Sequence, residues 1–300
     1  MTDRTETLVC DGKNLVMRNF YAYPDGLSAD GQRTNLIHGS FLELFRLIAK
    51  FQPARVVFTW DSKSTFRQAI FPGYKAKRRG TPLEPAVWEN LEMQIRVFRE
   101  GLSALSVIQV AVEGVEGDDL VALSVLEKRH QPCLIISTDR DFWQLVRPGV
   151  VSIYDPRTKS VLGGSGFSRV TGFDSPDHHL AFKILKGDPG DGVPPAVVRM
   201  GEAKAKILAR TLRLPDTTWL REMDRHTRLS FAPFDEVVET ALARNFKLIS
   251  LHAAIFAQRN LLATVRFDRP ASHWQRFLEF CKRYRLTMVM KAYGDVKNRV

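Results

Sequence analysis

The sequence predicts an α/β protein with a doubly wound, mostly parallel sheet, and three observations support this class. Short apolar segments alternate with longer amphipathic patterns through the first half of the 300-residue chain, as in repeated strand–helix–strand units. Hydrophobic residues make up 44% of the chain, which is enough for a substantial core. Each apolar segment is followed by acidic residues, and parallel strands would gather these at one edge of the sheet.

Four segments have the composition of buried strands. Each is short, apolar and rich in Val, Ile, Leu or Phe, and turn-forming or charged residues follow it. The segments are Thr7–Cys10, Arg55–Trp60, Ser106–Val112 and Cys133–Ser137. Farther along, Val150–Tyr154 and Lys159–Leu162 flank a proline-containing turn and predict a hairpin.

Helical patterns fill the intervals between these strands. Leu36, Phe41 and Ile48 share one apolar face of a predicted helix. The charged stretch Thr81–Leu102 begins with proline residues and predicts a second helix, and a third follows the acidic run after Val112.

The glycine-rich segment Gly163–Gly166 is the best candidate for a flexible joint. Beyond it the patterns are helical, first over residues 178–213 and then from Pro233 to the end of the chain. We therefore expect a core domain of residues 1–175 and a helical region of residues 176–300.

Composition narrows the class of partner. The net charge of +11 favours a polyanion, because each neutralised phosphate releases condensed counter-ions. No apolar run reaches the roughly 20 residues that span a bilayer, so no membrane partner is expected. Cys10, Cys133 and Cys281 are odd in number and lie in apolar surroundings. They predict reduced core thiols in a cytoplasmic protein, without a disulfide framework or a zinc site.

Acidic residues follow each of the predicted strands. The set consists of Asp11, Asp61, Glu116, Asp118, Asp119, Asp139 and Asp141, and a later turn adds Asp188 and Asp191. On one edge of a sheet these carboxylates would repel one another, and hard divalent ions such as Mg²⁺ or Mn²⁺ would relieve that repulsion. Two such ions about 3.5–4 Å apart can assist an in-line phosphoryl displacement. Taken singly, these aspartates also fit helix N-caps or turns, but capping does not explain why acid follows every strand.

A basic and aromatic segment, Phe66–Arg79, begins shortly after Asp61. Aromatic rings interleaved with cations suit stacking on bases and pairing with phosphates. Lys75 and Arg78 lie three residues apart and would share one helical face. The alternative is a solvated surface helix with no role in binding.

A second basic region follows the glycine-rich turn Leu185–Pro194. It leads to a predicted helix that carries Lys204 and Lys206. A turn of this kind at a helix N-terminus offers backbone N–H groups to a phosphate. The alternative is a plain connection between two helices.

With these residues in view, the sequence resembles the 5′-nuclease family, which includes bacteriophage flap endonucleases and the N-terminal domain of bacterial DNA polymerase I. The matching motifs occur in family order. They are Leu8–Gly12, Val57–Asp61, Tyr74–Arg78, Gly114–Asp119, Ser137–Asp141 and Gly187–Asp191.

The resemblance implies a PIN-like core with a helical arch at about residues 66–100, a helix–three-turn–helix at about residues 180–212, and C-terminal helices. It implies that the acidic set above holds two Mg²⁺ or Mn²⁺ ions, and that Lys75 and Arg78 act on the scissile phosphate. Contacts with DNA are expected from Arg67, Tyr74, Lys77, Lys186, Gly190, Gly192, Lys204 and Lys206. A K⁺ site at the helix–three-turn–helix stays open, because Pro195–Gly201 departs from the family's usual hairpin.

The implied activity is metal-dependent hydrolysis of 5′ flaps and 5′ ends of DNA, with RNA primers on DNA as further substrates. A monomeric protein of the bacterial cytoplasm, encoded by a phage or by its host, is expected. Two alternatives remain open: a junction-binding protein of the same fold with weak catalysis, and a PIN-type ribonuclease. A small-molecule phosphatase would fit the metals but would leave the basic segments without a use.

Overall fold

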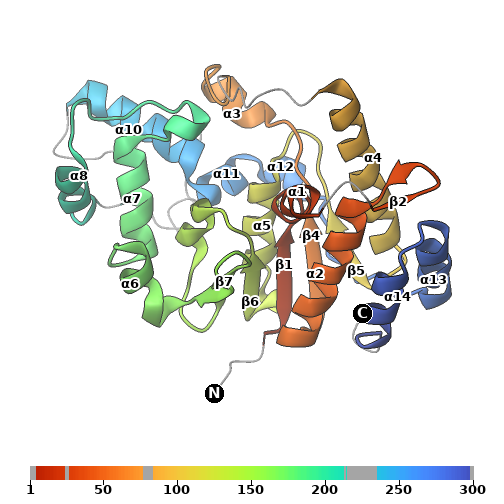
Figure 1. Ribbon diagram of the computed structural model, residues 1–300. Coiled ribbons are helices and arrows are strands. Elements are labelled where there is room, and N and C mark those ends of the chain that lie inside the picture. The colour runs from red at the N-terminus through yellow and green to blue at the C-terminus, as the bar shows by residue number, and fades with distance from the viewer. Residues whose placement is uncertain (1–4, 24–26, 77–83, 213, 215–234, 298–300) are drawn as a thin grey trace.

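The computed structural model of the chain describes residues 5–23, 27–76, 84–212, 214 and 235–297. Its centre is a six-stranded sheet with strand order β5-β4-β1-β6-β7-β8 (Figure 1). The strands are β1 (Thr7–Asp11), β4 (Arg55–Thr59), β5 (Val107–Val110), β6 (Cys133–Ile136), β7 (Val151–Asp155) and β8 (Ser160–Leu162). Neighbouring strands are parallel except β7 and β8, which form an antiparallel pair. The mostly parallel sheet and the hairpin at its edge are thus confirmed.

Both faces of the sheet are buried. Successive side chains of a strand point to opposite faces, so each strand contributes to two clusters. Leu8 and Cys10 of β1 belong to one hydrophobic cluster, whereas Val9 belongs to another. This alternation explains why the strands are apolar throughout instead of alternating with polar residues.

Helices cover each face. On one side lie α1 (Gly12–Ala22), α2 (Asn35–Phe51), α4 (Pro85–Leu102), α13 (Trp274–Arg283) and α14 (Thr287–Gly294). On the other lie α5 (Gly117–Leu126), the 3₁₀ turn η2 (Arg140–Leu145), α11 (Leu251–Ala257) and α12 (Arg259–Leu262). A short antiparallel pair, β2 (Ser28–Ala29) and β3 (Gln32–Arg33), precedes α2.

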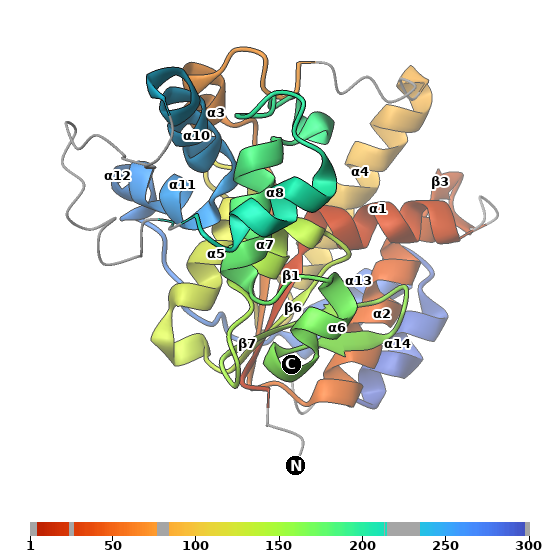
Figure 2. The ribbon, with the colours of Figure 1, turned by 90° about the vertical axis from the view of Figure 1, so that its left-hand side faces the viewer.

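A further helical part has a core of its own. It comprises α3 (Thr65–Ile70), α7 (Pro176–Lys186), η4 (Pro189–Asp191), α8 (Glu202–Ala209) and α10 (Glu236–Ile249). Figure 2 shows α7 and α8 side by side, with α3 and α10 next to them. Between α7 and α8 the chain runs through residues 187–201, which include η4. The assignment of this region to a helix–three-turn–helix stays a prediction.

Two features of the structure bear on the expected division between residues 175 and 176. First, within the segment predicted to be a flexible joint, a 3₁₀ turn, η3 (Gly164–Gly166), runs straight into α6 (Phe167–Thr171), and the Phe167 side chain is buried. Second, the C-terminal helices pack on the first part of the chain. Phe277 and Phe280 of α13 contact Phe41 of α2, with ring centroids 5.2 and 5.8 Å apart. The apolar face of α13 is buried on α2, so α13 and α14 complete the core around the sheet.

The helix predicted from Thr81 is described from Pro85 onward, and residues 77–83 lie outside the described residues. Cys10, Cys133 and Cys281 are free and buried, as predicted for core thiols. In the described ranges no helix has the length and apolar character needed to cross a membrane.

Candidate active site

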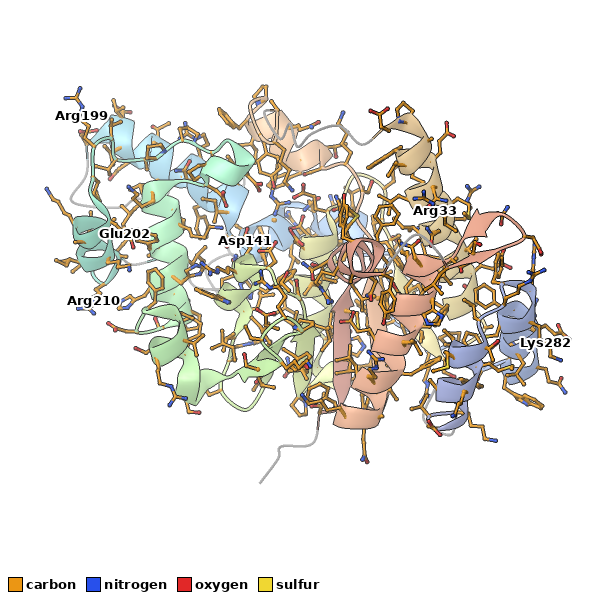
Figure 3. The ribbon with its side chains drawn as sticks, in the orientation of Figure 1. Arg33, Asp141, Arg199, Glu202, Arg210 and Lys282 are labelled. Atoms are coloured by element: carbon orange, nitrogen blue, oxygen red, sulfur yellow. The ribbon has the colours of Figure 1, made fainter. Side chains whose placement is uncertain are left out.

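The predicted carboxylates gather at the carboxyl edge of the sheet. Asp11 ends β1 and caps α1, where its Oδ1 accepts a hydrogen bond from the Asn14 N–H at 3.0 Å. Asp139 follows the neighbouring strand β6 and caps η2. In Figure 3, Asp141 marks this edge near the centre of the molecule, between the sheet and the helical part. Where a helix begins directly after a strand, the residue that caps the helix therefore also lies at the carboxyl edge of the sheet.

The centre of the cluster consists of Asp11, Asp118 and Asp139. Burial raises the pKa of Asp11 to about 6, and the charges of Asp139 and Asp61 add to this shift. Burial and then the charges of Asp11 and Asp139 raise the pKa of Asp118 well above its usual range. Burial and the charge of Asp141 likewise raise the pKa of Asp139. Negative charge at this point is only partly compensated by the protein, which is the electrostatic setting that a cation would relieve.

Lysines neutralise the flanks of the cluster. Lys13 Nζ lies 2.6 Å from Asp61 Oδ2, and the Gly117 N–H donates to Asp61 Oδ1 at 3.0 Å. Burial would raise the pKa of Asp61, but these contacts outweigh it and the pKa is lowered. On the opposite flank Lys183 contacts Asp141 and lies 2.8 Å from Asp188 Oδ2.

Lys13 and Lys183 were not among the site residues predicted from the sequence. Burial would lower the pKa of Lys183, but Asp141 and Asp188 outweigh it and raise that pKa. In the sequence each lysine lies within five residues of a motif aspartate. That proximity was the one available sign, and it does not distinguish an inward lysine from an ordinary surface lysine.

Lys75 lies on a third side of the cluster, with its Nζ 2.5 Å from Glu116 Oε1 and 4.0 Å from Asp191 Oδ2. Its backbone is left-handed, with φ of 55°, and its N–H donates to the Asp191 carbonyl at 2.7 Å. Gly192 has a φ of +73°, and a Cβ there would lie 2.9 Å from the Gly73 carbonyl oxygen. The turn that carries Asp188 and Asp191 therefore also fixes the backbone of the segment that carries Lys75.

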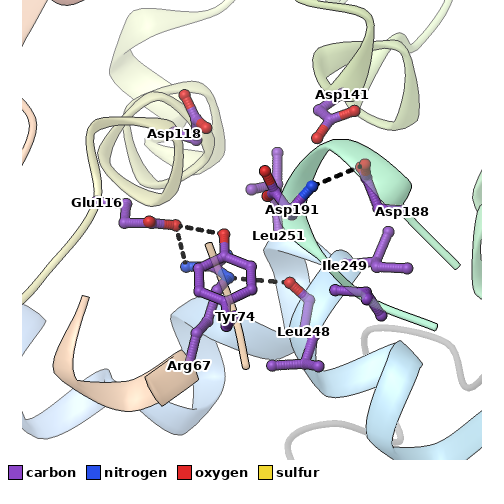
Figure 4. A pocket seen from close by; sticks show the side chains of 11 residues that line it. Arg67, Tyr74, Glu116, Asp118, Asp141, Asp188, Asp191, Leu248, Ile249 and Leu251 are labelled. Atoms are coloured by element: carbon purple, nitrogen blue, oxygen red, sulfur yellow. Dashed lines mark hydrogen bonds and ion pairs between the residues drawn. The ribbon is translucent and has the colours of Figure 1, made fainter. Parts of the chain in front are cut away.

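Arg67 and Asp119 lie behind the rim and not on it. Arg67 donates to both oxygens of Asp119 at 2.7 Å and lies 2.9 Å from Glu116 Oε2. It also donates to the Leu248 carbonyl (Figure 4), and Gln258 donates to Asp119. Arg67 is 2% exposed and Asp119 is 0% exposed. A buried bidentate ion pair thus occupies both groups in this structure, and the contact of Arg67 with DNA and the binding of a metal by Asp119 stay predictions.

Several predicted DNA contacts have other partners here. Tyr74 is 4% exposed, and its hydroxyl donates to Glu116 Oε2 at 3.0 Å (Figure 4). Lys186 donates to the Met200 carbonyl, which ties α7 to the chain before α8. Both side chains thus support the local fold here, and their contacts with DNA stay predictions.

Lys204 and Lys206 lie on α8, at the outer side of the helical part, whereas Gly190 and Gly192 lie in the turn that carries Asp188 and Asp191. Lys204 is exposed, and Lys206 forms an ion pair with Glu202 at 3.0 Å. Gly190 is exposed and Gly192 is half-buried in the turn before α8. In Figure 3 Glu202 and Arg210 mark this outer side. Lys77 and Arg78 lie outside the described residues.

The donor set fits a hard divalent cation, because it consists of carboxylate oxygens. A space of about 20 Å³ between Glu116, Asp118, Asp141 and Asp191 has room for a water molecule or a small ion (Figure 4). Within the described parts of the chain, no group of three or more His, Cys, Asp or Glu side chains is arranged so that it could hold a metal ion. Lysine ammonium groups hold several of the acids instead, so the fit rests on donor chemistry and on the charge at the centre.

Fold and site together define a class: an α/β domain of nuclease type, with carboxylates and lysines at the carboxyl edge of a parallel sheet. The chain belongs to the 5′-3′ exonuclease family, because the sequence model of its N-terminal resolvase-like domain matches residues 6–170.

Curated relatives include DNA polymerase I and a separate 5′-3′ exonuclease, both of Mycobacterium tuberculosis. The polymerase is 32% identical over 213 residues, which are 66% of this chain and 22% of the polymerase. The exonuclease is 28% identical over 231 residues, which are 69% of this chain and 71% of that protein. The aligned region thus spans about a fifth of the polymerase relatives and most of the exonuclease.

Solved structures share the fold at low sequence identity. The bacteriophage T5 flap endonuclease superposes with a TM-score of 0.65 and 20% identity, over 92% of this chain and 99% of that chain. The catalytic core of Rad2 gives a TM-score of 0.53 and 13% identity, over 99% of this chain and 92% of that chain.

Proposed function

We propose that this chain is a divalent-metal-dependent 5′ nuclease, which hydrolyses phosphodiester bonds at 5′ flaps and 5′ ends of DNA. The observation that carries the proposal is the group of central acids, Asp11, Asp118 and Asp139, whose pKa values are raised at the carboxyl edge of a parallel sheet. Perturbed carboxyl groups at such an edge mark functional sites. The family membership and the names of relatives, a 5′-3′ exonuclease and a flap endonuclease, support the same activity.

Two divalent ions are proposed as cofactors. Asp11, Asp118 and Asp139 would hold them at the centre, and Asp61, Glu116, Asp141, Asp188 and Asp191 would complete the site directly or through water. When bound, such ions activate a water molecule and neutralise charge that develops on the phosphoryl oxygens. The T5 enzyme has been crystallised with metal ions and DNA, which supports this assignment.

Lys75 is proposed to bind the scissile phosphate. Its ammonium group lies over Glu116, and its backbone is fixed by the Asp191 carbonyl. Once cations neutralise the carboxylates, the attraction of Glu116 for Lys75 weakens, and a phosphate becomes the better partner. Arg78 is proposed from the sequence to assist it. The product would carry a 5′-phosphate.

The helical part is proposed to grip duplex DNA. Lys204 is exposed on α8, and the turn before that helix carries Asp188 and Asp191 to the acidic edge, with its Gly190 and Asp191 N–H groups donating to the Asp188 side chain. Cations on this surface would hold phosphates without reading sequence. The proposal leaves K⁺ binding at this turn open, and it includes action on RNA–DNA hybrids.

The test is cleavage of a 5′-flap DNA, labelled at its 5′ end, in Mg²⁺, in Mn²⁺ and in EDTA. Metal-dependent release of the flap near the junction is expected, with a 3′-flap DNA and a single-stranded RNA left intact. Asp141→Asn should bind the flap and fail to cut it, because it removes an expected ligand and little positive surface. Binding without cleavage by the wild type would favour a junction-binding protein, and cleavage of the RNA alone would favour a ribonuclease.

A further inference from the structure

Lys13 is a lysine at the acidic edge that the proposed reaction does not use. It lies in the first turn of α1, directly after the Asp11-Gly12 pair. Its side chain is 61% exposed, and its Nζ contacts Asp61 Oδ2 at 2.6 Å. Among the described residues this is the one polar contact of its ammonium group.

Stability does not account for a lysine at this position. A cation in the first turn of a helix opposes the helix dipole, which favours acidic residues there. An exposed ion pair contributes about 0–1 kcal/mol. Asp61 does not depend on Lys13 for all of its hydrogen bonds, because the Gly117 N–H donates to its other oxygen at 3.0 Å.

The position of Lys13 relative to Lys75 suggests a role. Lys13 contacts Asp61 and Lys75 contacts Glu116, while Gly117, the residue after Glu116, donates to Asp61. The two ammonium groups therefore flank one linked pair of carboxylates, Asp61 and Glu116.

We propose that Lys13 is a second phosphate-binding residue of this site, whose ammonium group contacts a backbone phosphodiester of the nucleic acid next to the phosphate at Lys75. The proposal rests on the proposed nuclease function. Lys13 is the more exposed of the two lysines, at 61% against 22% for the Lys75 side chain. Cations bound at the acidic edge would weaken its attraction to Asp61 and leave the ammonium group to the phosphate. Its contact would aid binding more than the chemical step.

The test is the salt dependence of DNA binding. Fluorescence anisotropy with the 5′-flap DNA in Mg²⁺ would be measured in an Asp141→Asn background, which prevents cleavage. Each phosphate contact contributes about 0.7–0.9 to the slope of log K against log salt concentration. Lys13→Ala should reduce the magnitude of the slope by about this amount, and Lys13→Arg should restore it.

Arg129→Ala is the matched control. Arg129 is also an exposed cation paired with a carboxylate, Glu127, but it precedes β6 and lies at the opposite edge of the sheet. Its removal deletes the same charge and should leave the slope unchanged. In the cleaving enzyme, Lys13→Ala should raise KM several-fold with kcat nearly constant, as expected for a contact made equally in the ground and transition states.

An unchanged slope in Lys13→Ala, or an equal change in Arg129→Ala, would overturn the proposal while the nuclease function stands. A wild type that neither binds nor cuts the flap would instead refute the nuclease function, and the role of Lys13 with it.

Discussion

The first turn of α5 has two faces that differ sharply, although consecutive aspartates form them. Asp118 faces the acidic centre, where Asp11 and Asp139 raise its pKa. Asp119 faces the interior, where Arg67 and Gln258 hold both its oxygens. A helix rotates about 100° per residue, so neighbours in the chain meet different surroundings.

One acidic motif thus has two roles. The buried pair of Asp119 and Arg67 fixes α3 against α5, and Arg67 reaches Glu116 as well. It supplies the scaffold. Asp118 is held in an unfavourable electrostatic environment, and that environment is what a bound cation would relieve.

The largest expected effect is on the rate of cleavage, which should depend strongly on Asp118. Asp118→Asn should slow single-turnover cleavage by about 10³-fold, because it removes a carboxylate proposed to hold the catalytic cations. Its free energy of unfolding in EDTA should not fall, since repulsion with Asp11 and Asp139 is removed. Rapid-quench kinetics and urea denaturation would measure the two quantities. Full activity in Asp118→Asn would show that the two faces do not divide the work as described.

Arg67→Met tests the buried side of α5, where Asp119 pairs with Arg67. It should lower the free energy of unfolding by about 3–5 kcal/mol, because it leaves the Asp119 carboxylate buried without its partner. Urea denaturation in EDTA would measure this loss. Arg129→Ala, which opens an exposed ion pair, should change stability by about 1 kcal/mol or less. Equal losses in the two variants would contradict the scaffold role of Arg67.

The pH dependence of stability tests the acidic centre that Asp118 faces, through its neighbour Asp11. Since burial raises the pKa of Asp11 from 3.8 to about 6, the folded protein binds more protons than the unfolded chain between these values. The free energy of unfolding should therefore fall as the pH rises from about 4 to about 6, by about 3 kcal/mol from this group. Urea midpoints in EDTA would show the trend. Asp11→Asn, which retains a capping side chain, should reduce it, and a rise in stability over the same range would be the opposite result.

Gly192→Ala tests whether the turn that carries Asp188 and Asp191 positions the segment with Lys75. The left-handed backbone should cost about 1–3 kcal/mol of stability, and the new Cβ would press on the Gly73 carbonyl. Cleavage should slow because the segment that carries Lys75 moves. Gly172→Ala is the control, since Gly172 has the same φ of +73° but nothing within 4 Å of a Cβ. A rate unchanged in Gly192→Ala would show that the turn does not position Lys75.

Much of the fold was predictable, because it depends on local patterns. The apolar runs around Val9, Val57 and Ile135 marked the buried parallel strands, and their order indicated a doubly wound sheet. The packing of α13 on α2 was not predictable. Phe277 and Phe41 are far apart in the sequence, and an apolar helix face does not specify which surface it covers.

The candidate site followed the same division. Asp11, Asp61 and Asp139 could be assigned to one edge because each follows a strand, and parallel strands end on the same side. Lys13 and Lys183 could not be assigned, since nothing in a sequence shows where a flexible lysine side chain points.

The order of strands and acidic residues along the chain was enough to predict a charged edge that suits a cation. Which of the acids share that edge depends on how the elements pack. The tertiary structure turned Asp118 toward the centre and Asp119 toward Arg67, and it brought Lys183 from α7 to Asp141. Strand and helix periodicity depend on residues that are neighbours in the sequence, so they can be predicted from it. The partner of a charge depends on which elements pack around it, and these can be far apart in the sequence.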